Sequence, residues 1–400
     1  MRILFVTPYI PSHVRVRPYN LLRVLARRGH DLTLLTLQPP GDEGEALYEL
    51  RGWCEQVHVV PHRSWQVLLN EVKALPGRFP LQAAYSASHE FDRTARDLLA
   101  EQRFDVAHVE HLRGAALAKS LTTVPIVFDS VDSISLLFGK VLQGAPGLKS
   151  RLMAWLDLGR TRRFEGRLTQ RFKQVIVTSP IDRQALVDLG CDAERVTVVP
   201  NGVDLGYFQP QALERDPLRL VFTGKMSYHA NVAAVKDLVE QIMPLVWAKQ
   251  PDVQLQIVGK DPTPAVLALA EHPNVTVTGS VPDMRPYLAQ AAIAVSTVRY
   301  GVGIQNKVLE AMAMGTPVVC SAQATSSLQT QPGRDLLVGD TPDEIAQHLL
   351  VLLESPEKRK AIGDAGRRYV ETHQSWERSV SLLEDVYEEA LYERAVTARG

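Results

Sequence analysis

Short apolar runs alternate with segments of helical spacing along the first half of the chain. Residues 3–6 (ILFV) form a run that Thr7-Pro8 ends, and such a run fits a strand buried on both faces of a parallel sheet. Residues 19–28 then place leucines on one helical face, and Gly29 follows where a helix favours termination. The same pattern predicts further strands at residues 32–37, 57–60, 106–109, 126–128, 175–178 and 196–199.

A second α/β series begins after a polar segment, residues 209–217, which we interpret as a linker. Beyond it the pattern predicts strands at residues 218–223, 255–258, 275–278, 292–296 and 317–320, and helices at 232–246, 263–271, 287–291 and 308–314. A last helix, residues 376–395, is long enough to return to the first half. We therefore predict two α/β domains: residues 1–208, with 376–400 packed back on them, and residues 209–375.

Composition narrows the classes of function. The 400 residues are 45% hydrophobic and 22% charged, as in ordinary globular proteins. A net charge of −1 argues against a nucleic-acid-binding protein, which usually has a basic excess. The three cysteines are too scattered for a disulfide framework, and the N-terminal apolar run is too short for a signal peptide. We expect a cytoplasmic protein with no nucleic-acid partner.

The strongest chemical signal lies in residues 298–320 (VRYGVGIQNKVLEAMAMGTPVVC). A loop with Gly301 and Gly303 leads into a helix that holds Glu310 among apolar residues. A helix N-terminus at the carboxyl end of a parallel strand suits a diphosphate. A carboxylate in an apolar helix needs a partner, and two ribose hydroxyls would supply one. The alternative is that Glu310 is a surface residue and the glycines only form turns.

These residues resemble the retaining GT-B glycosyltransferases of family 4. KVLEAMAMGTPVV is similar to the family's Glu-Ala-Met-Ala-x-Gly-x-Pro-Val-Val pattern, with supporting matches in RVLARRGHDLTLLT, FDVAHVEHLR, VVPNGVDLGYFQP, LRLVFTGKM and VTVTGSVPDM. The resemblance implies two Rossmann-like parallel-sheet domains facing across a deep cleft. It also implies transfer of a sugar from a nucleotide sugar, UDP being favoured over GDP, to a glycan, lipid-linked or small-molecule acceptor in polysaccharide or glycoconjugate biosynthesis.

The resemblance further implies roles for individual residues. Lys225 stands where the family has an arginine against the diphosphate, and a fixed cation there stabilises the leaving group. The family's second lysine would fall near Ala230; Lys307, close to Glu310 on the helix, is the predicted substitute, and an ordinary Lys307–Glu310 pair is the alternative. The implied donor-binding set is Gly224, Val281, Met284, Arg299, Gly301, Gly303, Ile304, Gln305, Asn306, Val308, Leu309 and the ribose-binding Glu310.

Two regions depart from the family pattern. Val302 replaces a carboxylate that usually meets the sugar. The usual glycine-rich first loop is replaced by a loop with Ser12, His13, Arg15 and Arg17. Because arginine suits phosphate, we predict that this loop binds a phosphate of the donor or the acceptor. A plain surface loop is the alternative.

The strand at residues 106–109 delivers three further candidate catalytic residues, His108, Glu110 and His111, to its carboxyl end. The family typically has a second histidine where Glu110 stands. Side chains alternate along a strand, so His108 and Glu110 share a face. We predict that Glu110 or His111 touches the donor sugar, while a buried core histidine is the alternative for His108.

No metal and no cofactor are expected. Asp129 and Asp132 have the wrong spacing for the Asp-x-Asp loop of metal-dependent transferases. Two other functions of the same fold stay open: a sugar-nucleotide 2-epimerase, which acts on the donor alone, and a non-catalytic sugar-nucleotide-binding protein, which the loss of the carboxylate at Val302 would fit.

Residues 140–173 are basic, with apolar residues interleaved. Against Asp157 and Glu165 stand Lys140, Lys149, Arg151, Arg160, Arg162, Arg163, Arg167, Arg171 and Lys173. Basic amphipathic segments bind anionic membranes, so this segment is a candidate for peripheral contact with the inner face of a membrane. The alternative is a solvated helix pair that packs its apolar face inward.

Overall fold

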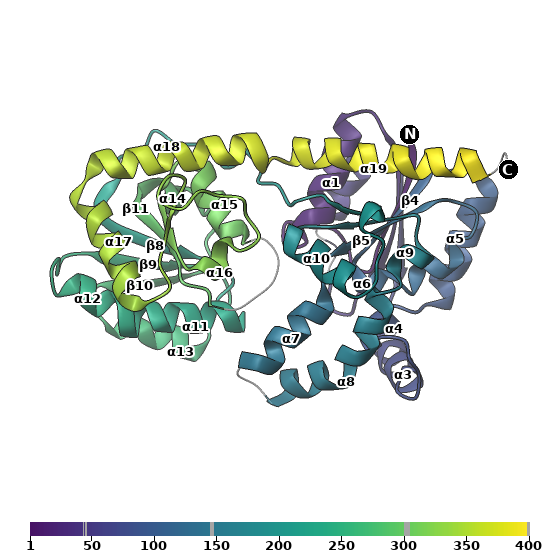
Figure 1. The fold of residues 1–400 in the computed structure, drawn as a ribbon, viewed down its shortest axis with the longest axis horizontal. Helices are drawn as coiled ribbons and strands as arrows, with labels where there is room; N and C mark the ends of the chain where they lie inside the picture. Colours follow the sequence, from purple (N-terminus) through teal and green to yellow (C-terminus); the bar gives the residue numbers. More distant parts are fainter. Residues whose placement is uncertain (43, 45, 145–147, 300–304, 398–400) are drawn as a thin grey trace. The chain divides into compact units, whose positions relative to one another are not determined.

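The chain divides into two compact units (Figure 1). The computed structural model describes residues 1–42, 44, 46–144, 148–299 and 305–397. The first unit comprises Met1–Asn201 and Trp376–Gly400, and the second comprises Gly202–Ser375. Each unit is an α/β structure built on its own parallel sheet, as predicted.

The first unit is built on a seven-stranded parallel sheet in the order β3-β2-β1-β4-β5-β6-β7. Its central strands are almost entirely buried, which explains why they are continuous apolar runs in the sequence. The strands are β1 (Arg2–Thr7), β2 (Asp31–Gln38), β3 (Gln56–Pro61), β4 (Val106–Glu110), β5 (Ile126–Val131), β6 (Gln174–Val177) and β7 (Val196–Val198).

Helices cover both faces of this sheet. One face packs against α1 (Val16–Arg27), α2 (Leu47–Trp53) and the C-terminal helix α19 (Trp376–Thr397). The opposite core includes residues of α5 (His89–Glu101), α6 (His111–Gly114), α7 (Ile134–Gly144), α8 (Leu148–Glu165), α9 (Leu168–Arg171) and α10 (Pro180–Asp188). Two more helices, α3 (Ser64–Ala74) and α4 (Leu81–Ala84), lie between β3 and α5 in the chain.

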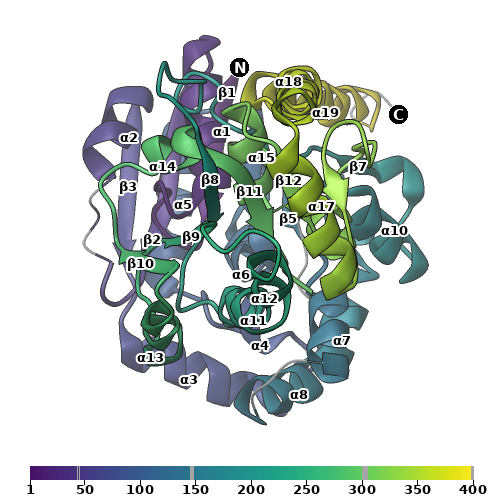
Figure 2. The ribbon, with the colours of Figure 1, turned by 90° about the vertical axis from the view of Figure 1, so that its left-hand side faces the viewer.

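The second unit has a six-stranded parallel sheet in the order β10-β9-β8-β11-β12-β13 (Figure 2). The strands are β8 (Asp216–Thr223), β9 (Gln254–Val258), β10 (Val275–Gly279), β11 (Ala291–Ser296), β12 (Val318–Cys320) and β13 (Leu337–Val338). β13 was not predicted, because two residues are too short for a periodic signal.

Helices cover both faces of the second sheet as well. One core includes α11 (His229–Asp237), α12 (Met243–Trp247), α13 (Pro264–Leu267) and α17 (Pro342–Glu354). The other includes α14 (Arg285–Gln290), α15 (Asn306–Ala313), α16 (Ala322–Thr325) and α18 (Pro356–His373). The single helix predicted at residues 232–246 is divided by a π-helical turn, Leu238–Ile242, just before Pro244, which has no N–H to continue an α-helical ladder.

The boundary between the units differs from the predicted one by residues 202–208, which pack with the second unit. The amide of Val203 donates to the carbonyl of Gln374 at 2.7 Å, and Val203 and Phe208 pack in the core beside α15 and α18.

The strand orders place reversal points between β1 and β4 and between β8 and β11. Ligands of doubly wound sheets bind at the carboxyl ends of strands at such points.

A buried polar network joins α1, β4, β5 and α19 in the first unit. Nε of Arg17 donates to the Asp129 carboxylate at 2.6 Å, and Nη1 donates to the Val199 carbonyl at 3.0 Å. The His108 ring lies 3.5 Å from the same carboxylate, and its Nδ1 is hydrogen-bonded to the Tyr387 hydroxyl at 2.9 Å. Burial opposes ionisation of Asp129, but Arg17 and His108 hold the pKa of its carboxyl below the usual value.

This network changes two predictions. Arg17 is 4% exposed and His108 is 0% exposed, so both side chains lie in the interior of the unit, as in the core-histidine alternative for His108. Burial lowers the pKa of His108, and its ring stacks on Phe5 with centroids 4.2 Å apart. Both residues tie together segments that are distant in sequence, through Nε and Nη1 of Arg17 and Nδ1 of His108.

Replacing Asp129 with Asn should lower the free energy of unfolding by about 3 kcal/mol or more, because the buried Arg17 guanidinium loses its counter-charge. Glu384→Gln is the matched control: it removes the charge of a partly exposed carboxylate on α19 that contacts Arg28 and His30, which should cost about 1 kcal/mol or less. Urea unfolding followed by circular dichroism measures both. Equal losses for the two variants would contradict this account.

Candidate functional site

Glycines form the carboxyl edge of the second sheet where β8 and β9 end. Gly224 and Gly259 have φ of +147° and +153°, conformations that side chains rarely adopt. A Cβ on Gly259 would stand 1.7 Å from the Gly224 carbonyl oxygen. The loops that follow β8 and β9 are therefore in close contact, and at these two glycines their backbone carries no side chain.

Lys307 of α15 reaches this edge. Its Nζ donates to the Asn231 side chain on α11 at 2.5 Å and lies 4.4 Å from the centre of the Phe222 ring. The Asn231 amide donates in turn to the Lys225 carbonyl at 2.9 Å. Burial lowers the pKa of Lys307 to about 7, against the influence of nearby Glu310. The direct contacts of this partly buried ammonium, Asn231 and Phe222, are neutral, and an anionic ligand would stabilise its charge further.

Glu310 lies one helical turn beyond Lys307 and is partly buried. Burial raises the pKa of its carboxyl to about 7, and Lys307 opposes the rise. Within the described part of the chain, the Glu310 carboxylate has no hydrogen-bond or ion-pair partner. Lys307 and Glu310 therefore influence each other's pKa without forming an ion pair among the described residues.

Lys225 and Arg299 are the two more exposed cations of the predicted set. Nζ of Lys225 lies 3.5 Å from Asp261, which follows β9, and Nε of Arg299 lies 3.1 Å from Asp237 of α11. Both side chains are about half exposed, at 51% and 48%. Such pairs exchange readily with solvent and are easily replaced by a charged ligand.

The N-terminus of α15 has free capacity for an acceptor. Gln305 precedes the helix without a side-chain cap, so its side chain does not accept from the first amides of the helix. Helix N-termini carry unpaired N–H groups and a partial positive charge. Lys307 follows directly, so the amides and the ammonium lie at one end of the helix.

The remaining members of the predicted donor set divide into three groups. The side chains of Val308 and Leu309 are 1% and 0% exposed, so only their backbone is left to meet a ligand. Val281 and Met284 are partly buried against the core beside α15. Gly301, Gly303 and Ile304 lie outside the described residues, as does Val302.

A second group of polar residues lies where β4 of the first unit ends. Burial, with Asp129 nearby, raises the pKa of Glu110 to about 8, and its carboxyl faces the side chain of Tyr9. The Arg15 guanidinium covers the Tyr9 ring, 4.2 Å from its centre. His111 has a φ of +66°, a strained conformation that is typical of functional sites. Burial lowers the pKa of His111 to about 3, with Arg113 and Arg15 adding to the effect.

The other residues of the first loop lie at its surface. Ser12 Oγ accepts hydrogen bonds from the amides of Val14 and Arg15, both at 3.3 Å. His13 is 75% exposed. Ser12 and Arg15 border a hollow of about 430 Å³ that is lined by Ile10, Ser12, Val14, Arg15, Pro39, Pro40, Gly41, Asp42 and Ala46.

Sequence reasoning missed Asn231 and Tyr9. Asn231 is 6% exposed, and its position in the first turn after the Gly224 loop was a usable signal, since a polar residue in an otherwise apolar helix needs a partner. Tyr9 carried no such signal, because nothing in its local pattern indicates that it faces Glu110.

Each of the two units matches a glycosyltransferase family model. The Glycosyltransferase Family 4 model matches residues 14–207, and the Glycosyl transferases group 1 model matches residues 217–355. Between them the two matches include most of the chain.

Curated relatives share about half of their length with this chain. A GDP-mannose-dependent monoacylated alpha-(1-6)-phosphatidylinositol monomannoside mannosyltransferase of Corynebacterium glutamicum is 34% identical over 201 residues, which are 45% of this chain and 52% of the relative. An MMP alpha-(1->4)-mannosyltransferase of Mycolicibacterium hassiacum is 29% identical, over 54% of this chain and 53% of the relative.

Solved structures match the chain over nearly its full length. Sucrose-phosphate synthase from Thermosynechococcus elongatus has a TM-score of 0.71 and 18% identity, with 100% of both chains covered. Anabaena Alr3699/HepE in complex with UDP has a TM-score of 0.65 and 16% identity, over 97% of this chain and 99% of that one. At these identities the likeness establishes the fold.

Gly224→Ala should destabilise the second unit by about 1–3 kcal/mol, because φ is unfavourable and the new Cβ would lie 2.8 Å from the Asn231 amide and 3.2 Å from Lys307 Nζ. Gly333→Ala is the matched control: φ is +84°, but nothing lies within 4 Å, so a loss of about 1 kcal/mol is expected from φ alone. Differential scanning calorimetry compares them. A smaller loss for Gly224→Ala than for the control would show that this edge is not tightly packed.

Proposed function

Because the chain belongs to the family 4 glycosyltransferases, we propose that it transfers a sugar, with retention of configuration, from a nucleotide sugar to a hydroxyl of a glycan, lipid-linked or small-molecule acceptor. The observation that carries this proposal is the group of Gly224, Asn231, Lys307 and Glu310 in the second unit. It combines a desolvated cation, exposed glycine backbone and a carboxylate that has no hydrogen-bond partner among the described residues, which are the groups needed for a diphosphate and a ribose.

The donor diphosphate would lie against Lys307 and the amides at the start of α15, with Lys225 as a second cation. Binding there supplies the negative charge that the Lys307 ammonium lacks in the ligand-free site. The unpartnered Glu310 carboxylate would accept hydrogen bonds from the ribose hydroxyls. Fixed cations beside a leaving diphosphate stabilise the charge that develops on it.

The transfer step needs no nucleophile from the protein. The bond between the anomeric carbon and the diphosphate oxygen breaks, and the acceptor oxygen bonds to the same face of that carbon. The acceptor proton passes to the departing diphosphate oxygen, so charge and protons balance. Because Lys225 and Lys307 supply the positive charge, we propose that the step needs no metal ion.

The first unit would meet the sugar or the acceptor. Glu110 with its raised pKa is protonated at neutral pH and can donate a hydrogen bond to a sugar oxygen, and Arg15 and His111 stand near the same strand end. UDP stays the predicted nucleotide of the donor. Because the name of the Corynebacterium relative specifies GDP-mannose, binding of UDP and of GDP should both be measured.

Glu310→Ala should weaken nucleoside diphosphate binding by at least about 1 kcal/mol, because it removes hydrogen bonds to a charged group. Calorimetry with UDP and GDP, and then with their sugars with and without EDTA, measures this and identifies the donor. Glu354→Ala, an exposed carboxylate at the end of α17, is the control. Unchanged affinity in Glu310→Ala would remove Glu310 from the site, and epimerisation of the donor without acceptor would replace the proposed transfer.

Diphosphate binding should take up a proton at pH 8. The pKa of Lys307 in the free protein is lowered to about 7 by burial, so Lys307 is mostly neutral at pH 8. A bound anion favours its charged form, which raises this pKa, and affinity should therefore fall as pH rises above 7. Calorimetry in buffers of different ionisation enthalpy measures the uptake. It should vanish in Lys307→Met and persist in Lys225→Met; uptake that survives in Lys307→Met would assign the proton to another group.

A further inference from the structure

Helix α3 of the first unit turns its apolar side outward. None of its residues is buried. Trp65, Leu68, Leu69 and Val72, at the i, i+3, i+4 and i+7 positions of one helical face, are 59%, 64%, 42% and 52% exposed. An amphipathic helix normally packs such a stripe against the core, so this one lacks the partner that its sequence is patterned for.

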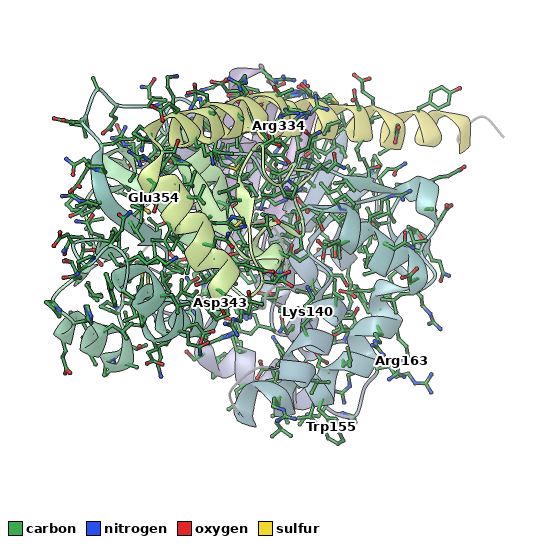
Figure 3. All side chains as sticks on the ribbon, turned by 60° about the vertical axis from the view of Figure 1, so that its left-hand side comes forward. Lys140, Trp155, Arg163, Arg334, Asp343 and Glu354 are labelled. Carbon is green, nitrogen blue, oxygen red and sulfur yellow. The ribbon has the colours of Figure 1, made fainter. Side chains whose placement is uncertain are left out.

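Helix α8 presents a similar surface. Leu152, Trp155 and Leu156 are 55%, 69% and 41% exposed, while Ala154, Asp157 and Thr161 face inward. Nη2 of Arg160 is hydrogen-bonded to the carbonyl of Leu75, just after α3, which links the two helices. They lie along the same end of the first unit in both ribbon views (Figures 1 and 2), and Figure 3 shows Trp155 and Arg163 pointing outward. We call the exposed apolar residues of α3 and α8 the α3–α8 surface.

The exposed charge around this surface is mostly positive, although α3 also carries the partly exposed Glu71. The two acidic residues of α8, Asp157 and Glu165, are 0% and 1% exposed; they accept hydrogen bonds from the amides of Leu81 and Ile134, respectively. The basic residues are exposed instead: Arg63, Lys73, Arg78, Arg151, Arg162, Arg163, Arg167 and Arg171. A chain of net charge −1 thus surrounds the α3–α8 surface with exposed arginine and lysine.

A hollow at the end of α8 adds a place for an anionic group. It has a volume of about 450 Å³ and is lined by Arg162, Arg163, Gly166, Arg167, Gln170, Leu189 and Gly190. Three guanidinium groups at one hollow suit a phosphate, which arginine binds through paired donors.

We propose that the α3–α8 surface docks on an anionic lipid bilayer. Its tryptophans and leucines would enter the interfacial layer while its arginines meet lipid phosphates, which is how amphipathic helices bind membranes. A second copy of this chain fits less well, because it would bring two basic surfaces together. In the described residues no helix is long and apolar enough to cross a bilayer, so the contact is with one leaflet. Sequence analysis pointed to residues 140–173 only; α3 extends the surface.

Co-sedimentation of the full chain with vesicles tests this proposal. We expect binding to phosphatidylcholine vesicles that contain 30% phosphatidylglycerol, weak binding to pure phosphatidylcholine, and loss of most binding in 0.5 M salt, which screens surface charge. Trp65→Glu combined with Trp155→Glu should lower the partition coefficient at least tenfold, and so should Arg162→Glu combined with Arg163→Glu. Leu267→Glu, a residue of the second unit that is 51% exposed, is the control and should bind as the wild type does.

The outcomes separate the docking surface from the donor site. All substituted side chains are exposed, so thermal unfolding and nucleotide binding should not change, and neither readout requires the proposed transfer activity. Equal binding of the wild type and both double variants to anionic vesicles would overturn the proposal. So would a wild-type dimer, measured by light scattering after gel filtration, that the tryptophan variant converts to monomers, because the surface would then belong to a second copy.

Discussion

The arrangement of residues at the carboxyl edge of the second sheet depends on the ammonium group of Lys307. It is held at the end of β8 by a neutral amide, Asn231, and by the face of Phe222, and burial makes its charged form less stable. Gly224 leaves space for it, since a Cβ there would lie 3.2 Å from Nζ. The nearby Glu310 favours the charged form of Lys307 without forming an ion pair with it, and a ligand anion can add to this stabilisation because water screens the interaction little there.

In the first unit, by contrast, the buried cation is paired with a counter-charge. Arg17 lies in α1, and its guanidinium is bonded to Asp129, the Val199 carbonyl and Asn201. A buried charge with its counter-charge stabilises the native arrangement, whereas one without it is available for binding. The difference in pairing, rather than in burial, therefore separates the structural cation from the candidate binding cation.

The partners of a buried charge also determine how far its role could be predicted from the sequence. The order of strands followed from apolar runs, because strands of a covered parallel sheet are buried on both faces. Glu310 was predicted because a charge in an apolar helix is a local anomaly, and Lys307 because the family resemblance implies a lysine nearby. For Arg17 a ligand phosphate was predicted, and for His108 a ligand or a core position, because their partners, Asp129 and Tyr387, are 112 and 279 residues away. Pairing over such distances is fixed by tertiary packing, which no local pattern reports.

The same limit applies to the outer surface of the first unit. Residues 140–173 contain both acids and bases, and the sequence does not tell which of them are exposed. The structure buries Asp157 and Glu165 as hydrogen-bond acceptors for the amides at the starts of α4 and α7, and it leaves arginines outside. The acids that stabilise helix ends in the interior are thereby removed from the surface, so the local packing of α8 is itself the cause of the excess positive charge around Trp155.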